Sequence, residues 1–306
     1  MANAFIKADQ IVQAAVLLLQ RQLVVARTVW AQPDAAFVGS LDDTITLSVP
    51  AVRTARTRTM RAASALVADD LTESKVPVQL NTHVYDLLKI TDEQLTLDIR
   101  NFITQVLAPQ MRGVAEGMEN VIVDALQAAT FEADAIPFEE GADEPYDVLI
   151  DANKALNKLN VPRTERVALV GANVEAALLK SDKLSKVNES GTGEALREAI
   201  ITRVAGFTVI GSNALGEDEA FCYHRSAIAF ANVAPALPDG APHKARVATE
   251  GFALRHIRDY DPANSTGPVD RSLVDAFVGA ASVGSGDDGT DPNQRGVAIE
   301  FTPAGT

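Results

Sequence analysis

The residue types that most often perform catalysis or bind metals are scattered along this chain. It has four histidines, His83, His224, His243 and His256, and no two of them have the short spacing of a metal-binding pair. Each is therefore interpreted as a surface or interface residue. Cys222 is the only cysteine, so it can form neither an internal disulfide nor, by itself, a thiolate metal site. We expect it to be a small buried side chain.

Two glycine-containing segments could approach a phosphate group or a substrate. The segment ESGTGEA (189–195) lacks the Gly-Lys-Ser/Thr ending of a P-loop and also lacks the G-x-G-x-x-G pattern. Gly-Ser-Asn at 211–213 follows a predicted strand and is interpreted as a turn. The chain contains no G-x-S-x-G motif, which argues against a serine hydrolase of that type.

Acidic residues are the remaining candidates for metal binding or acid–base chemistry. The loop GSGDDGTDPN (284–293) does not have the spacing of a calcium-binding loop and is interpreted as a solvated loop. Asp259 and Asp261 lie at the end of a predicted strand, where either an acid–base pair or a turn explains them. The sequence therefore predicts no catalytic residues, no cofactor and no metal site.

Composition and charge restrict the class of protein. The 306 residues are 47% hydrophobic and carry a formal net charge of −14. This charge opposes the wrapping of nucleic acid, which needs clustered Lys and Arg, and favours solubility. The apolar run at 14–19 is too short to span a membrane or to act as the core of a signal peptide. We expect a reducing cytoplasm as the place of synthesis.

The first third of the chain predicts elements that project from a compact core. Apolar residues at helical spacing predict a helix over 5–30. Alternation of apolar and polar residues predicts a strand around Ile45–Val49 and a second strand in KVPVQLNTHVY (75–85). About 25 residues lie between these two strands, so they predict an extended hairpin with a long polar tip, which is usually a functional feature.

A long helix is predicted after the hairpin. Thr91 and Gln94 form a capping-box pattern, and apolar residues then recur at helical spacing as far as Leu126. A helix over Asp92–Ala129 would be about 55 Å long at 1.5 Å per residue. Pro109 is expected to bend it. A helix of this length is interpreted as the spine of the molecule.

The rest of the chain alternates between helical and strand patterns after an acidic linker, FEEGADEPYDV (138–148). The segment AFCYHRSAIAFAN (220–232) predicts a strand that runs into an apolar segment with either a helical or a strand-like pattern. The other predicted elements are helices at 148–159, 172–179 and 194–204, strands at 167–171 and 206–211, two long strands at 250–261 and 270–283, and a short strand at 296–301.

Five of these stretches, taken in order, carry a resemblance to a known family. They are GSLDDTITLSVP (39–50), VYDLLKITDEQLTLDIRNFITQVLAPQMRGVAEGMENVIV (84–123), YDVLIDANKALNKLNVPRTERVALVG (146–171), REAIITRVAGFTVIGSNAL (197–215) and AFCYHRSAIAFA (220–231). The ordered set covers nearly the whole chain. It resembles the tailed-bacteriophage major capsid proteins of the Hong Kong 97-type fold, and within them the coat proteins of phages of actinobacteria.

The resemblance implies an α+β chain with an N-terminal arm, an extended β-hairpin loop, a peripheral domain with a long spine helix, and an α/β axial domain. Gly206 would serve backbone geometry rather than a ligand. The implied ranges are 1–33 for the arm, 34–82 for the extended loop, 83–146 for the peripheral domain with its spine helix, 147–246 for the axial domain, 247–283 for the long strands of the peripheral domain, and 284–306 for a C-terminal acidic loop and short strand.

The resemblance also implies a function without catalysis. The chain would self-assemble through pentamers and hexamers into an icosahedral head, which encloses double-stranded phage DNA without sequence-specific binding. It would be made in the host bacterial cytoplasm and reside in the virion. Its partners would be other copies of itself, a portal and a decoration or minor capsid protein, with no membrane. No long charged helical segment precedes the arm, so a separate scaffolding protein is implied.

The hairpin tip differs from that of relatives that cross-link covalently. Those relatives use a lysine on this loop, whereas residues 53–70 contain no lysine and Lys75 lies at the base of the second strand. We therefore expect no covalent cross-links between subunits.

The same tip carries a basic cluster in an acidic chain: Arg53, Arg56, Arg58 and Arg61, followed on the returning side by Asp69 and Asp70. A solvated tip is the simple alternative, and a nucleic-acid patch is disfavoured because no aromatic residues are interleaved. We predict that these residues contact an acidic surface of an adjacent subunit.

Two other functions compete with the phage shell. An encapsulin-type nanocompartment shell has the same fold and would enclose a cargo enzyme instead of DNA. A cytoplasmic α/β nucleotide-binding enzyme is the alternative from another class, and a soluble monomer that binds nucleotide would favour it.

Overall fold

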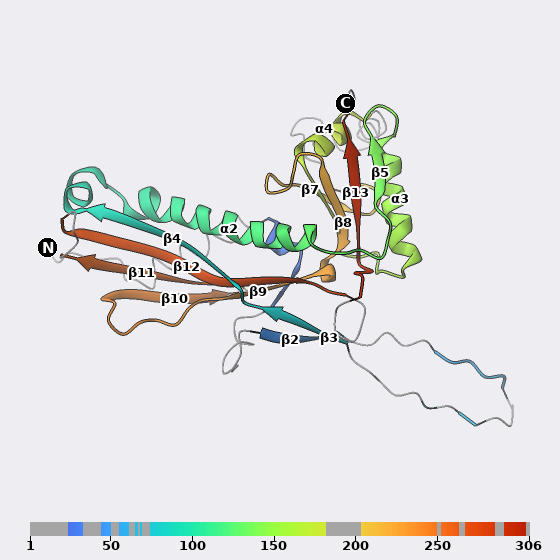
Figure 1. Cartoon of the computed structure of the whole chain (residues 1–306), viewed down its shortest axis with the longest axis horizontal. Helices are drawn as coiled ribbons and strands as arrows, with labels where there is room; N and C mark the ends of the chain where they lie inside the picture. Colours follow the sequence, from blue (N-terminus) through green and yellow to red (C-terminus); the bar gives the residue numbers. More distant parts are fainter. Residues whose placement is uncertain are drawn as a thin grey trace.

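The computed structural model describes residues 24–32, 44–49, 55–60, 65–66, 68, 74–181, 203–249, 252–262, 267–284 and 291–303. These residues form an elongated body and a compact body that meet near one end of a long helix (Figure 1). The elongated body contains a six-stranded sheet, the compact body contains a five-stranded sheet, and a two-stranded hairpin lies beside them. The mixed α+β class predicted from the sequence is confirmed.

The centre of the six-stranded sheet is β12 (Val269–Ser282). Asp275 pairs with both β4 and β11, and Phe277 pairs with both β4 and β9, so β4 lies along one side of β12, and β11 and then β9 lie along the other. The remaining strands extend the sheet in the order β1-β9-β12-β11-β10. Their bounds are β1 (Trp30–Gln32), β4 (Thr82–Thr91), β9 (Ile228–Val233), β10 (His243–Thr249) and β11 (Phe252–Asp261).

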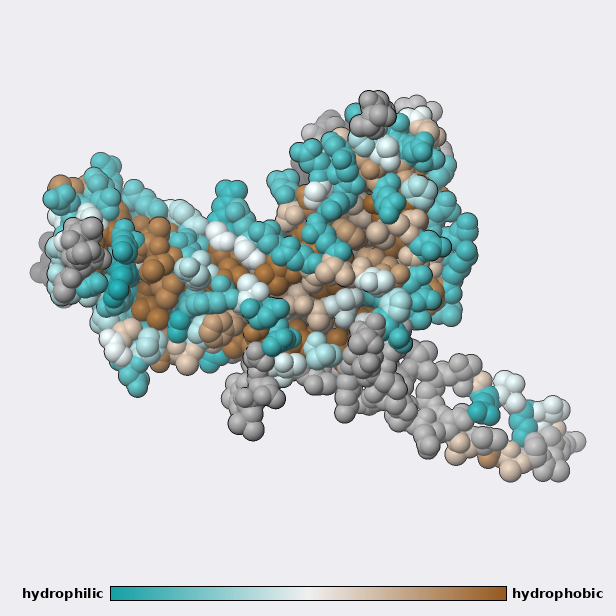
Figure 2. All heavy atoms as spheres, in the orientation of Figure 1, coloured by the Kyte–Doolittle hydropathy of each residue, from teal (hydrophilic) through white to brown (hydrophobic). Residues whose placement is uncertain are grey.

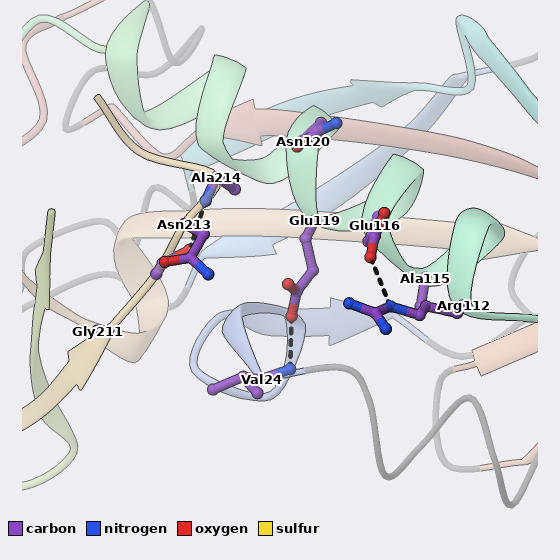
Figure 3. A pocket seen from close by; sticks show the side chains of 10 residues that line it. Val24, Arg112, Ala115, Glu116, Glu119, Asn120, Gly211, Asn213 and Ala214 are labelled. Atoms are coloured by element: carbon purple, nitrogen blue, oxygen red, sulfur yellow. Dashed lines mark hydrogen bonds and ion pairs between the residues drawn. The ribbon is translucent and has the colours of Figure 1, made fainter. Parts of the chain in front are cut away.

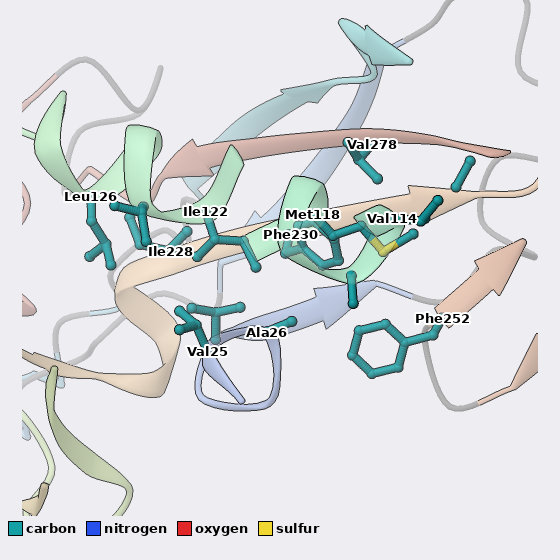
Figure 4. Packing of buried hydrophobic residues seen from close by; sticks show 14 of the residues in the cluster. Val25, Ala26, Val114, Met118, Ile122, Leu126, Ile228, Phe230, Phe252 and Val278 are labelled. Atoms are coloured by element: carbon teal, nitrogen blue, oxygen red, sulfur yellow. The ribbon is translucent and has the colours of Figure 1, made fainter. Parts of the chain in front are cut away.

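One face of this sheet is covered by α2 (Ala108–Gln127). The apolar residues that the sequence places on one helical face are fully buried against the sheet, as Figure 4 shows for Met118, Ile122 and Leu126. Gly117 permits a close approach, because a Cβ atom at this position would lie 2.6 Å from Cγ1 of Val84 on β4. The predicted apolar periodicity of the spine is therefore confirmed over α2.

The start of the predicted spine helix differs from the expectation. A continuous helix over Asp92–Ala129 is wrong, because Ile99 has an extended ψ of 105°. The side chain of Gln105 accepts the backbone N–H groups of Arg100 and Asn101, at 2.8 and 3.0 Å. These bonds replace the helical hydrogen bonds at the break. The helix is therefore interrupted, although the apolar spacing of the sequence continues through this point.

Both sides of this break contain π-helical turns, at Gln94–Asp98 and Ile103–Leu107. The predicted capping box is present: the backbone N–H of Thr91 donates to Oε1 of Gln94, and that of Gln94 donates to Oγ1 of Thr91. The second π turn ends at Leu107, two residues before Pro109, which has no N–H for an i→i−4 bond. The helix accommodates this proline by a change of hydrogen-bond register.

The five-stranded sheet of the compact body has the strand order β5-β13-β8-β6-β7. Its strands are β5 (Ile136–Glu139), β6 (Arg166–Val170), β7 (Thr208–Gly211), β8 (Glu219–His224) and β13 (Gly296–Thr302), and its helices are α3 (Pro145–Lys158) and α4 (Ala172–Lys180). The helices and strands predicted within 148–179 and 206–211 are confirmed, as is the final strand, whereas β5 was not predicted. The predicted helix at 194–204 lies mostly outside the described residues.

A buried arginine ties α3 to β6. Arg166 is 2% exposed, and it donates to Oδ1 of Asn153 at 2.8 Å and to Oδ1 of Asn157 at 2.9 Å, both on α3. It also donates to the backbone carbonyls of Val161 and Pro162, just after the helix. Burial, and then the nearby charge of Arg163, lower the pKa of Arg166. The cation is stabilised by oxygen acceptors at the negative end of the helix dipole.

The two bodies are joined by the segment predicted as one strand with an apolar continuation. Residues 220–232 instead form most of β8, a 3-10 turn at Arg225–Ala227, and most of β9, so the segment leaves one sheet and enters the other. Hydrophobic residues from both bodies share a core, in which Leu169 and Tyr223 belong to the same cluster as Met118. The two sheets are therefore packed on common side chains.

The end of the predicted N-terminal helix is also different. Residues 5–23 lie outside the described residues, but Val25–Arg27 is a 3-10 turn and Trp30–Gln32 is strand β1, parallel to β9. Prediction of a helix as far as residue 30 is therefore wrong, because the backbone of Trp30–Gln32 pairs with an edge of the sheet. Periodicity alone does not reveal such pairing.

The hairpin consists of β2 (Thr44–Val49) and β3 (Ser74–Gln79), which are antiparallel with Thr46 opposite Pro77. The second predicted strand, 75–85, is divided, because β3 ends at Gln79 and β4 begins at Thr82 in another sheet. The described stretch 55–60 is exposed at every residue and lies far from both bodies in Figure 1.

The implied domain ranges and the two sheets do not have the same limits. β9 and the first four residues of β10 lie within 147–246 but pair in the long sheet, while β5 and β13 lie outside that range but pair in the compact one. In the view of Figure 2, hydrophobic residues reach the surface of the elongated body between hydrophilic ones.

The buried face of α2 generates a stability prediction. Leu126→Ala removes a fully buried side chain and should lower the free energy of unfolding by about 2–5 kcal/mol. Leu97→Ala is the matched control, because Leu97 is 78% exposed and its truncation should change stability by no more than about 0.5 kcal/mol. Equal denaturant midpoints for the two variants would show that the α2 face does not carry this stability.

Candidate functional site

Metal-binding side chains do not gather in the part of the chain that the structure describes. Within the described ranges, no three His, Cys, Asp or Glu residues could hold a metal ion together, and no helix is long and apolar enough to cross a membrane. Cys222 is fully buried, as predicted, and burial raises the pKa of its thiol to about 12. The phosphate-loop candidate at 189–195 and most of the acidic loop at 284–293 lie outside the described residues.

The acidic pair at the end of β11 has a structural role. Arg271, on the neighbouring strand β12, forms ion pairs with both Asp259 and Asp261. Arg258 pairs with Asp270 in the same two strands. The carboxylates are thus ion-paired across β11 and β12.

The expectation of surface or interface histidines is wrong for His224 and His256, which are buried within the chain at 9% and 4% exposure. Oγ of Ser272 donates to Oε1 of Gln110 at 2.8 Å, so it accepts from Nε2 of His256 at 3.1 Å. Gln110, on α2, also donates to the backbone carbonyls of Asp86 and Ser272. This network holds α2 against β4, β11 and β12.

The environment of His256 favours the neutral imidazole. Burial, and then the charge of Arg258, lower its pKa from 6.5 to about 4, although Asp270 acts in the opposite direction. Phe102 also lies beside it, with ring centroids 6.4 Å apart, and Arg258 stacks over the same Phe102 ring. The spine helix is therefore attached to the sheet through a neutral polar network with aromatic and cationic neighbours.

The sheet face opposite α2 is partly uncovered among the described residues. Tyr85 and Leu87 on β4 are 61% and 46% exposed, and Phe277 on β12 is 38% exposed. The His83 ring stacks near both aromatic rings, with centroids 5.3 Å from Tyr85 and 4.9 Å from Phe277. Beside them, His83 and Arg255 both contact the buried carboxylate of Asp275. This aromatic and apolar face is a candidate contact surface.

The root of the N-terminal segment lies between the two bodies. Oε1 of Glu119, on α2, accepts the backbone N–H groups of Val24 and Val25, at 2.5 and 2.8 Å. The hydroxyl groups of Thr28 and Tyr223 are 2.6 Å apart, which links the same root to β8. Figure 3 shows Glu119 and Val24 in an open pocket of about 590 Å³, which the turn at 211–214 also lines. The Gly-Ser-Asn turn therefore faces the arm root.

The predicted contact residues at the hairpin tip are only partly described. Arg56 and Arg58 are exposed, whereas Arg53, Arg61, Asp69 and Asp70 lie outside the described residues. The contact predicted for these residues therefore stays a prediction. Gly206 has a φ of +91°, so the expectation that it serves backbone geometry agrees with the structure.

Comparison with known proteins decides the family. The profile of the family described as phage capsid protein matches residues 73–267, which is more than half of the chain. The chain belongs to the phage capsid protein family. No curated protein matches its sequence.

Solved capsid structures share the fold of this capsid protein at low sequence identity. A chain from Mycobacterium phage Che8 is 19% identical with a TM-score of 0.62, and the match covers 90% of each chain. A chain in the capsid of the cyanophage P-SCSP1u is 10% identical with a TM-score of 0.63, covering 99% of this chain and 91% of that one. A chain in the mature capsid of bacteriophage PhiM1 is 14% identical with a TM-score of 0.54, covering 85% and 82%.

These findings confirm the Hong Kong 97-type fold and the role of a tailed-phage major capsid protein that forms the head shell. The capsid protein is located in the virion, in a shell built from copies of itself. The nanocompartment and enzyme alternatives are not favoured. The candidate functional site is therefore a set of contact surfaces.

The His256 network generates a prediction about pH. The unfolded chain binds this proton with a pKa near 6.5 and the folded chain with a pKa of about 4, so the unfolded state binds more protons between these values. Stability should fall as the pH is lowered from 6.5 to 4, by on the order of 3 kcal/mol from this residue. His256→Gln should remove that part of the pH dependence in urea denaturation.

His243→Gln is the matched control, because His243 lies on the exposed β10 edge. Carboxylates also titrate between pH 4 and 6.5. The quantity to compare is therefore the slope of the free energy of unfolding against pH, as the difference between each variant and the unaltered chain. A slope that His256→Gln leaves unchanged would contradict the buried neutral histidine.

Proposed function

We propose that this capsid protein is a structural subunit without catalysis, which assembles through pentamers and hexamers into an icosahedral shell around double-stranded DNA. The observation that carries the proposal is the hairpin, whose described tip residues 55–60 are exposed and distant from both bodies. A segment held away from its own core has contacts to gain from another copy. The net charge of −14 fits enclosure of DNA without wrapping it.

The two bodies support domain roles that follow their sheets. We propose that the six-stranded sheet and α2 form the peripheral domain and that the five-stranded sheet with α3 and α4 forms most of the axial domain. β9 and β10 then belong to the peripheral domain, and β5 and β13 to the axial one, which modifies the ranges implied by the resemblance. Residues 1–33 and 34–82 are proposed as the arm and the extended loop.

Further partners follow from this role. A separate scaffolding protein would direct shell assembly, a portal would occupy one vertex, and a decoration or minor capsid protein would bind the finished shell. Synthesis would take place in the host bacterial cytoplasm. Mature particles should dissolve to single subunits in denaturant, because no lysine lies within the hairpin tip at 53–70.

The contact proposed for the tip is electrostatic. Arg53, Arg56, Arg58 and Arg61 would meet an acidic surface of an adjacent subunit, with Asp69 and Asp70 on the returning side of the same tip. Exposed ion pairs contribute about 0.2–1 kcal/mol each, so one pair decides little. The same contact would recur at every hairpin of a symmetric shell, and salt would weaken it.

Charge reversal of the tip tests this contact. Changing the four arginines to glutamate should leave the subunit folded by circular dichroism and should block or distort assembly, measured as particle yield by sedimentation across a salt series. The control changes four exposed cations of the compact body to glutamate: Lys154, Lys158, Arg163 and Lys180. Normal shells from the tip variant, or an equal defect in the control, would contradict a specific role of the tip.

Truncation of the arm gives a second test. Removal of residues 1–22 keeps the buried Val25, Ala26 and Val29, so the shortened subunit should fold. It should form no regular shells in negative-stain micrographs if the arm contacts neighbouring subunits. Removal of residues 1–30 is the contrasting variant, because it deletes those three core residues and should lower the melting temperature. Regular particles from the shorter truncation would show that the arm is dispensable.

A further inference from the structure

The root of the hairpin lies on the face of the long sheet that is opposite α2. Val76 and Val78 of β3 are buried, at 1% and 0% exposure, and they cluster with Ala229 and Ala231 of β9. The residues of β9 that alternate with these alanines, Ile228 and Phe230, belong to the cluster around α2. Because side chains alternate along a strand, α2 and β3 must cover opposite faces of the sheet.

The surface under β3 consists of very small residues. Gly279 of β12 pairs with Ala231 of β9, and Ala281 pairs with Ala229, so these four positions are adjacent on one face. A Cβ atom on Gly279 would lie 1.9 Å from the carbonyl oxygen of Gln79. That atom is backbone, so no change of rotamer can relieve the clash.

The chain uses this space to change direction. Thr82, the first residue of β4, pairs with Val278 of β12 in antiparallel register. If β4 began earlier in the sequence, its preceding residues would pair along the same edge of β12 beyond Val278. Instead the backbone at Gln79 and Leu80 crosses over Gly279, and β3 runs across β9 and β12. The path of the hairpin away from the body is therefore decided at this crossing.

We propose that Gly279, with Ala229, Ala231 and Ala281, forms a seat that sets the direction in which the hairpin leaves the body. Gly279 is then a positioning residue for the contact that the tip makes with a neighbouring subunit. The inference rests on the proposed role of the hairpin in assembly, and it adds the residues that orient the hairpin.

The length of the hairpin makes its direction sensitive to the seat. A two-stranded ribbon has little stability of its own, so its orientation depends on what its root packs against. The paired strands β2 and β3 are six residues long, and the described residues 55–60 beyond them are not in a strand. A fully extended chain from Gln79 to Met60 would span at most roughly 60 Å at 3.3 Å per residue. A tilt of about 10° at the root would move a point at that distance by about 10 Å, which exceeds the reach of an ion pair.

A distance measurement in dissociated subunits tests the seat directly. Spin labels are placed on Thr57→Cys, in the exposed tip, and on Asp124→Cys, on the exposed side of α2. The distance between the two labels, measured by pulsed electron paramagnetic resonance, reports the direction of the hairpin. The native Cys222 is fully buried, so labelling is confined to the introduced residues. Gly279→Ala should move the mean distance by about 10 Å or broaden its distribution markedly.

Gly240→Ala is the matched control, because no atom lies within 4 Å of a Cβ at that glycine. Val78→Ala is the second variant, because it loosens the root from the hairpin side without adding bulk to β12. It should broaden the distance distribution even if Gly279→Ala fails to fold. Melting temperature, measured in parallel, reports any loss of stability, which a purely structural glycine would show without a change in distance.

The outcomes separate the seat from the function of the hairpin. A distance distribution that neither Val78→Ala nor a folded Gly279→Ala changes would overturn the seat. An altered distance together with misassembled particles by electron microscopy supports both the seat and the role of the hairpin. An altered distance with normal particles supports the seat and overturns the proposed contact function.

Discussion

The packing of one face of α2 is the contact on which the rest of the structure depends. Met118, Ile122 and Leu126 are buried in a cluster that takes residues from both sheets, including Tyr223 of β8 and Phe230 of β9. The chain passes between the sheets through the short turn Arg225–Ala227, so a covalent link and a shared core act at the same place. The two bodies are thus held together by a shared core at their junction, although the compact body also has a core of its own.

The two projecting segments begin at this same junction, on different sides of it. The arm root lies on the α2 side, where Glu119 caps its backbone and Val25 enters the core. The hairpin root lies on the other face, against the alanines of β9 and β12. β9 contacts both roots, through β1 at its edge and β3 on its face. The segments proposed to reach other subunits are therefore both attached to β9, which is buried at five of its six residues.

Much of this architecture was predictable because hydrophobic periodicity and capping are local signals. Failures occurred where a distant side chain or a second sheet decided the outcome. Gln105 ends the first helical segment without any change in apolar spacing, and the burial of His256 depends on Gln110 and Ser272. Residues 220–232 are buried almost throughout, so alternation gave no sign of two sheets. The partner predicted for Arg56 belongs to another copy, and no single chain specifies it.

The strand order of the compact body also governs how it forms during synthesis. β13 lies between β5 and β8, and no other strand in the described ranges pairs with β5. The five-stranded sheet is therefore incomplete until residue 302 has left the ribosome, although α3, β6 and α4 appear far earlier. The long sheet has all its strands by Ser282. The long sheet can therefore pair all its strands in a chain that lacks β13, whereas the compact sheet cannot close until β13 is present.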